Sequence, residues 1–82
     1  EETTPHDELE RTEALAVALQ ILDELDDDKR AIFVLYEVEQ LPMSEIADAV
    51  GCPLQTAYSR LYAARREVAQ RLSRMRARGR VE

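Results

Sequence analysis

The sequence has few of the residues from which enzyme and metal sites are built. Cys52 is its only cysteine, so an internal disulfide is excluded, and no second cysteine or nearby histidine supports a zinc site. Its only histidine is His6, Cys52 has no candidate base beside it, and no glycine-rich phosphate loop occurs. We therefore expect a protein that is not an enzyme and that uses no cofactor and no metal.

Long apolar segments are also lacking. No run of about 18 apolar residues occurs, and the chain does not open with the charged, apolar and small segments of a signal peptide. This predicts a cytoplasmic protein without membrane insertion. The length of 82 residues suits one small domain. Because the chain begins with an acidic run and without methionine, we expect it to be a fragment of a longer protein.

The net charge of −6 hides an asymmetry between the two halves of the chain. Residues 1–48 contain 15 acidic and three basic residues, which give a net charge of −12. Residues 49–82 contain eight arginines and two glutamates, which give a net charge of +6. DNA would be attracted to the C-terminal half and repelled by the N-terminal half. The distribution therefore predicts a domain that is oriented as it binds DNA.

Residues 43–66 contain two helical patterns that meet at Gly51, Cys52 and Pro53. The first pattern must end at Gly51, a residue that can adopt the left-handed conformation found just after many helices. Pro53 has the backbone dihedral of a first helical residue, so a second helix is expected to begin there. The apolar residues of this second helix recur at steps of three and four: Leu54, Ala57, Leu61, Ala64, Val68, Leu72 and Met75. The spacing predicts a helix, a tight turn and a second helix.

The face of the second helix opposite its apolar stripe is polar and positively charged. It presents Gln55, Ser59, Tyr62, Ala63, Arg66 and Gln70. Polar side chains in the major groove can read base edges, and arginines can also neutralise phosphates. This face therefore predicts DNA binding.

The residues around this turn carry a family resemblance. They are Leu41, Glu45-Ile46-Ala47, Gly51, Pro53, Thr56, Ser59-Arg60-Leu61 and Ala64-Arg65. Together with the leucine-rich segment upstream, they resemble region 4 of bacterial sigma factors, especially the small extracytoplasmic-function (ECF) class, over roughly residues 15–72. The resemblance implies an all-α domain of about four helices that binds the −35 element of double-stranded promoter DNA. It also implies docking on the flap of the RNA polymerase β subunit and masking by an anti-sigma factor.

The resemblance assigns roles along the second helix. We predict Gln55, Ser59, Tyr62 and Arg66 at or near base edges, and Thr56, Arg60 and Arg65 at phosphates. Tyr62 has three possible roles: ring contact with a thymine methyl, a hydroxyl bond to a phosphate, or helix packing alone. Tyr58 and Ala63 stand where relatives often carry basic residues, so the base preference of the family is not expected to transfer.

The expected organisation is a single domain over residues 1–82. It comprises an acidic lead-in or linker at 1–8, an N-terminal helix pair at 9–40, a helix–turn–helix with a long recognition helix at 43–76, and a basic tail at 77–82. Thr4, Pro5 and Asp7 form a helix-start pattern, so the first helix can begin within the lead-in. An apolar stripe from Leu9 to Leu25 continues it to about Glu24. The tail is either a phosphate-binding extension or a solvated helix end.

Two connections between helices carry ambiguous signals. The three aspartates at 26–28 either ligate a divalent cation or, more simply, begin the second helix, where the helix dipole favours negative charge. Pro42 is expected at the first helical position of the helix–turn–helix, with its cap supplied by backbone or water.

Residues 29–39 are almost entirely apolar. Their composition allows a buried strand, but the acidic start, the length and the lack of a second strand-like run favour a helix. Such a helix has more apolar surface than one neighbour covers, so Phe33, Val34 and Tyr36 are expected either to fill the core or to bind a partner. The resemblance favours partner binding.

Two other functions compete with promoter recognition. A sigma-like module that binds an anti-sigma factor or polymerase without reading DNA is favoured by the acidic N-terminal half, Tyr58 and Ala63, and disfavoured by the arginines of the second helix. The DNA-binding domain of a response regulator shares the helix–turn–helix but usually lacks the Ser-Arg-Leu run at 59–61.

Overall fold

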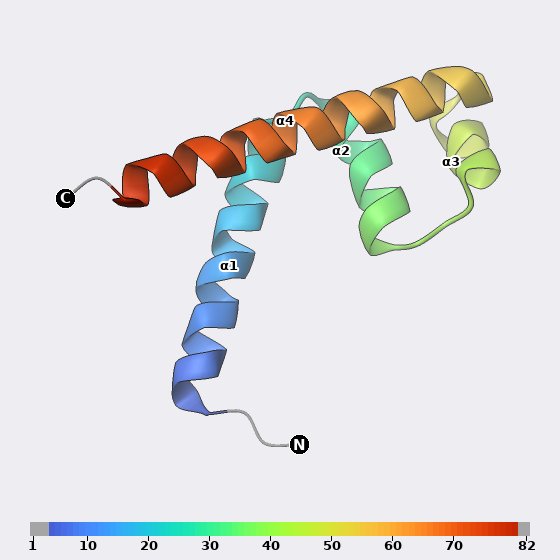
Figure 1. Cartoon of the computed structure of the whole chain (residues 1–82). Helices are drawn as coiled ribbons and strands as arrows, with labels where there is room; N and C mark the ends of the chain where they lie inside the picture. The colour runs from blue at the N-terminus through green and yellow to red at the C-terminus, as the bar shows by residue number, and fades with distance from the viewer. Residues whose placement is uncertain (1–3, 81–82) are drawn as a thin grey trace.

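The computed structural model describes residues 4–80, and side chains as far as Arg78; throughout this range every regular element is a helix. The elements are α1 (Pro5–Glu24), α2 (Asp27–Phe33), the π-helical η1 (Val34–Val38), α3 (Met43–Val50) and α4 (Leu54–Arg80). Figure 1 shows α4 as a long bar with α2 and α3 packed near its N-terminal half, while α1 projects away from it. The predicted all-α fold of about four helices is confirmed.

The hydrophobic core lies where α2 and α3 meet the first half of α4. Ile32, Ile46 and Leu61 are almost completely buried, and burial of each such side chain contributes about 1.5–3 kcal/mol to stability. The small residues Ala47 and Ala57 are buried with them at the contact between α3 and α4. Their size lets the two helices approach closely, and this fixes how α4 is presented to solvent.

Side-chain caps begin the first two helices where the sequence predicts them. The backbone N–H of Asp7 donates to Thr4 Oγ1 at 3.1 Å, and that of Lys29 donates to Asp26 Oδ1 at 2.9 Å. Asp27 and Asp28 follow in the first turn of α2, so the three aspartates start this helix as the simpler interpretation predicted. Because α1 already begins at Pro5, most of the described part of the predicted lead-in is helical.

The turn between α3 and α4 follows the predicted chemistry. Gly51 has a φ of 75°, and the N–H groups of Gly51 and Cys52 both donate to the Ala47 carbonyl, at 2.9 and 3.0 Å. The helix α4 begins at Leu54, one residue after the predicted start at Pro53, and the Pro53 carbonyl accepts from the Ala57 N–H at 3.0 Å.

The position of Pro42 differs from the prediction. Pro42 is the N-cap of α3 and not its first helical residue, with an extended ψ of 143°. Its carbonyl accepts from the N–H groups of Glu45 and Ile46 at 3.0 and 3.1 Å. No side-chain hydrogen bond caps the N-terminus of α3 in the described structure. The backbone, one of the two predicted sources of the cap, supplies these hydrogen bonds instead.

The helical interpretation of residues 29–39 is confirmed, because α2 and η1 cover residues 27–38. The apolar stripe of α1 is only partly covered: Leu9, Leu15 and Leu19 are 57–59% exposed, and Ile21 and Leu25 are buried. The recognition helix extends to Arg80, past the predicted end at 76, so the described part of the basic tail is helical. Residues 1–3 and 81–82 of the predicted lead-in and tail lie outside the described range.

Candidate nucleic-acid interface

One face of α4 is open to solvent directly after the turn. Gln55, Ser59, Tyr62 and Arg66 follow one another at steps of four, three and four residues, and all four are exposed. Tyr62 keeps 49% of its surface accessible. The opposite side of the same turns is buried against α2 and α3, which orients this face outward at one end of the molecule (Figure 1). The structure therefore brings together the four side chains predicted to read bases.

Arg60 lies on the flank of α4 next to α2. Its Nη2 atom is 4.0 Å from Asp28 Oδ2, the limit of an ion pair, and its side chain is one-third exposed. Thr56 lies one turn earlier on this flank and is half-buried. Since surface ion pairs at this separation contribute little, Arg60 can exchange Asp28 for a phosphate at small cost.

Arg65 lies on the other flank, next to η1, and is already bonded. Its Nε atom donates to Glu37 Oε2 at 2.6 Å. Its guanidinium carbon is 5.6 Å from the centre of the Tyr36 ring and 6.0 Å from that of Tyr62. The Tyr62 ring in turn lies 6.1 Å from the Tyr58 ring, tilted by 30°. Of the residues predicted at phosphates, Arg65 is therefore the one with the closest protein partners.

Sequence reasoning missed the acidic partners of these two arginines. Asp28 and Glu37 belong to the acidic half of the chain, which the charge distribution predicts to be kept away from DNA, yet both lie beside the predicted DNA-binding helix. Tyr36, predicted to bind a partner, packs against Arg65. Arg65 and Glu37 are 28 residues apart, and no local spacing signals such a contact.

A second group of charged side chains holds α1 and α2 against the middle of α4. Lys29 Nζ donates to Glu67 Oε2 at 2.6 Å, and Arg71 contacts both Glu67 (Nη1 to Oε1, 3.4 Å) and Glu24 (Nε to Oε1, 2.9 Å). The hydrogen bond from Lys29 holds the pKa of Glu67 below its usual range, and the same bond raises the pKa of Lys29. The backbone N–H of Lys29 likewise lowers the pKa of Asp26. These contacts support the site without facing the predicted DNA surface.

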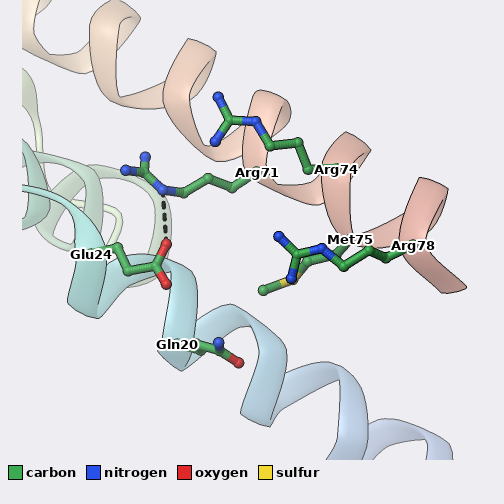
Figure 2. A pocket seen from close by; sticks show the side chains of 6 residues that line it. All are labelled: Gln20, Glu24, Arg71, Arg74, Met75 and Arg78. Carbon is green, nitrogen blue, oxygen red and sulfur yellow. Dashed lines mark hydrogen bonds and ion pairs between the residues drawn. The ribbon is translucent and has the colours of Figure 1, made fainter.

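Farther along α4 a small polar cleft of about 80 Å³ separates it from α1 (Figure 2). Arg71, Arg74 and Arg78 line it from α4, and Gln20 and Glu24 from α1. Figure 2 shows Arg71 directed at Glu24, whereas Arg74 and Arg78 have no acidic partner among the side chains that the structure describes. Within the described residues, this end of α4 therefore carries positive charge that no acidic side chain offsets.

An apolar groove of about 350 Å³ lies between α1, the end of α2, η1 and α4. Its lining comprises Ala14, Ala18, Ile21, Leu22, Phe33, Val38, Val68 and Leu72. Of the three predicted partner-binding residues, only Phe33 lines it. Val34 is half-buried elsewhere, and Tyr36 borders a separate open hollow with Gln40, Leu41 and Pro42. Val38, which was not predicted, also lines the groove and is 62% exposed.

The part of the chain that the structure describes contains no group of three or more histidine, cysteine, aspartate or glutamate side chains placed to hold a metal ion. Within the same residues, every helix is too short or too polar to span a membrane.

Comparison with known proteins identifies the family. Residues 15–68 match the family model described as Sigma-70, region 4, and this range includes the end of α1, all of α2, η1 and α3, and the first half of α4. No match was found among curated proteins. The matched range includes Gln55, Ser59, Tyr62 and Arg66 of the exposed α4 face, and it includes Arg60 and Arg65 on the two flanks of that face. The chain therefore belongs to the sigma-70 region 4 family, a family of DNA-binding regulatory domains that, in sigma factors, bind −35 promoter DNA and RNA polymerase.

Proposed function

We propose that the chain is the promoter-recognising domain of an ECF-type sigma factor, which inserts α4 into the major groove of the −35 element and directs RNA polymerase to initiate transcription. One observation carries the proposal: Gln55, Ser59, Tyr62 and Arg66 form an exposed face directly after the helix–turn–helix turn. In this motif the N-terminal part of the second helix contacts base edges. Such a role belongs to the bacterial cytoplasm, where the chromosome and polymerase are.

The proposed contacts divide by the chemistry of each side chain. Gln55 and Ser59 hydrogen-bond base edges, Tyr62 makes apolar contact with a base, and Arg66 reaches a base edge or the adjacent backbone. Thr56 and Arg60, on the flank next to α2, bind phosphates, and Arg60 leaves its loose 4.0 Å contact with Asp28 to do so. Arg74 and Arg78 extend the positive surface along α4 and favour the approach of DNA.

The apolar groove is the proposed docking site for the flap of the polymerase β subunit. Phe33 and Val38 line it together with residues of α1 and α4, and Leu15 and Leu19 add exposed apolar surface on α1. An apolar surface of this kind on a small domain marks a site of protein contact. An anti-sigma factor that covered the same groove would keep the domain from polymerase.

A second candidate function is a module that binds polymerase or an anti-sigma factor without reading DNA. It is favoured by Asp28 and Glu37, which lie against Arg60 and Arg65 and reduce the positive charge next to the exposed face. Both functions share the groove and differ only in whether α4 engages DNA.

Titration of the purified domain with a labelled duplex library, at two salt concentrations and followed by sequencing, distinguishes the two functions. We expect enrichment of one short motif and weaker binding at the higher salt, because each phosphate contact releases counterions. Arg66→Ala should reduce retention, whereas Arg11→Ala, which removes an exposed arginine from α1, should not. Retention without a motif would contradict sequence reading, and no retention at low salt would favour the protein-binding module.

A further inference from the structure

We infer that Arg65 is a positioning residue, which holds the ring of Tyr62 in place and makes Tyr62 a determinant of base preference. The inference rests on the proposed function, because it assumes that α4 reads DNA. It replaces the sequence-based expectation that Arg65 binds a phosphate.

The first step concerns the bonds that Arg65 already makes. Its Nε atom donates to Glu37 Oε2 at 2.6 Å, a charge-assisted hydrogen bond, and the Glu37 side chain is only 33% exposed. The Nη groups of Arg65 could still donate to a phosphate, but that phosphate would lie beside the Glu37 carboxylate, and repulsion between the two negative charges would oppose the contact. The acidic partner of Arg60 is Asp28, which lies 4.0 Å away and whose side chain is 71% exposed, so it opposes a phosphate contact of Arg60 much less. Arg65 is therefore poorly suited to a phosphate contact.

The second step concerns the rings on either side of Arg65. The guanidinium carbon lies 5.6 Å from the centre of the Tyr36 ring and 6.0 Å from that of Tyr62, both within the range of cation–π attraction. Tyr36 and Glu37 both belong to η1, so this short helix holds the guanidinium from two directions. Arg65 thereby connects η1 to the ring of Tyr62 on α4.

The third step concerns the freedom of Tyr62. An exposed tyrosine loses rotamer freedom when it is ordered at an interface, and this loss opposes binding. Tyr62 is 49% exposed, but Arg65 contacts it from one direction and the Tyr58 ring lies 6.1 Å away in another. These neighbours order the ring before DNA arrives. Since Tyr62 stands on the same face as Gln55 and Ser59, an ordered ring here contributes to the choice of base.

The contacts of Arg65 with Glu37, Tyr36 and Tyr62 are called the Arg65 clamp. The test is the double variant Glu37→Gln/Arg65→Gln, which removes this clamp and leaves the net charge unchanged. The matched control is Arg11→Gln/Glu13→Gln on the exposed surface of α1. For each protein, binding is measured to the preferred duplex and to duplexes with one base pair changed, at several salt concentrations. We expect the clamp variant to lose about 2- to 5-fold of its preference at one base pair, the range of an exposed cation–π contact. The salt dependence should remain that of the parent.

A smaller salt slope with full base preference would overturn the inference and restore Arg65 as a phosphate ligand. A parent protein without any base preference would instead contradict the proposed function. The clamp then has its own readout in the free protein, namely the ring resonances of Tyr62 in tyrosine-labelled NMR samples. These signals should move in the clamp variant and stay in place in the control, and unchanged signals in both would show that Arg65 does not position the ring.

Discussion

Lys29 and Glu67 form an ion pair between the first turn of α2 and the middle of α4, with Lys29 Nζ 2.6 Å from Glu67 Oε2. Both side chains are about 70% covered, and the contact joins residues 38 apart in the sequence. It therefore fixes the position of α4, and with it the exposed face that we propose to read DNA, relative to the N-terminal helices.

The first prediction is that this ion pair makes stability depend on pH. The pKa of Glu67 is lowered in the folded protein, chiefly by the hydrogen bond from Lys29, and that of Asp26 is lowered chiefly by the backbone N–H of Lys29. Each carboxylate thus contributes stability that is present above its unfolded pKa and is lost as pH falls through the lowered pKa. The pKa of Lys29 is raised, so the stability that its ammonium group contributes is present below its unfolded pKa and is lost only as pH rises through the raised pKa, at strongly alkaline pH.

Thermal unfolding followed by circular dichroism between pH 7 and pH 3 measures this effect. Glu67→Gln should lower the Tm at pH 7, and the difference from the parent should shrink as pH falls through the lowered pKa of Glu67. Glu13→Gln, on the exposed part of α1, should follow the parent throughout. A Tm difference for Glu67→Gln that stayed constant over this range would argue against the ion pair.

The second prediction concerns two residues with left-handed backbones. Gly51 has a φ of 75°, and a Cβ added there would meet nothing within 4 Å, so Gly51→Ala should destabilise through the backbone alone, by about 1 kcal/mol. Gln40 has a φ of 60° without being glycine, so Gln40→Gly should relieve strain and stabilise by up to about 1 kcal/mol. Urea unfolding at 25 °C measures both, and changes of the reverse sign would be inconsistent with these backbone conformations.

The third prediction separates phosphate contacts from base contacts on α4. Arg60→Ala should weaken binding to all duplexes and reduce the salt slope by about 0.9, because one phosphate contact is lost. Ser59→Ala or Gln55→Ala should change the preferred sequence, at a cost of about 1–3 kcal/mol for each good base contact. Quantitative binding to a set of single-base-pair variants checks both. An unchanged slope for Arg60→Ala, or an unchanged preference for both other variants, would show that the face is wrongly assigned.

The fourth prediction concerns the apolar groove. Val38 is 62% exposed at its edge, so Val38→Glu should leave the fold intact and place a charge where an apolar partner would sit. We expect loss of binding to the isolated polymerase β flap, with the parent's affinity for DNA retained, when both are measured by titration calorimetry. Leu9→Glu, at a position 57% exposed outside the groove lining, is the matched control. Equal binding of the flap by both variants would move the docking site elsewhere.

Signals from nearby residues were sufficient to predict the helices and the turn of the helix–turn–helix that we propose to bind DNA. A cap such as Thr4 or Asp26 acts on a backbone N–H three residues away, and Gly51 closes its helix with bonds to Ala47, so nearby residues specify these features. The apolar spacing of α4 likewise predicted the buried side at Ala57, Leu61 and Ala64, and therefore the exposed side opposite, whereas Leu54 at the start of the predicted stripe is 48% exposed. Where local prediction missed, as at Pro42, Pro53 and the end of α4, the errors were of position and not of element type.

Long-range packing decided the surroundings of the site. The contacts of Arg65 with Glu37 and of Lys29 with Glu67 join residues 28 and 38 apart, and each depends on how α2 and η1 lie against α4. The exposed leucines of α1 show the same dependence, because a helix predicts its own apolar face but not whether a neighbour covers it. Helix periodicity and capping follow from residues within a turn or two of each other. The pairing of distant charges and the covering of apolar faces exist only once the helices have packed.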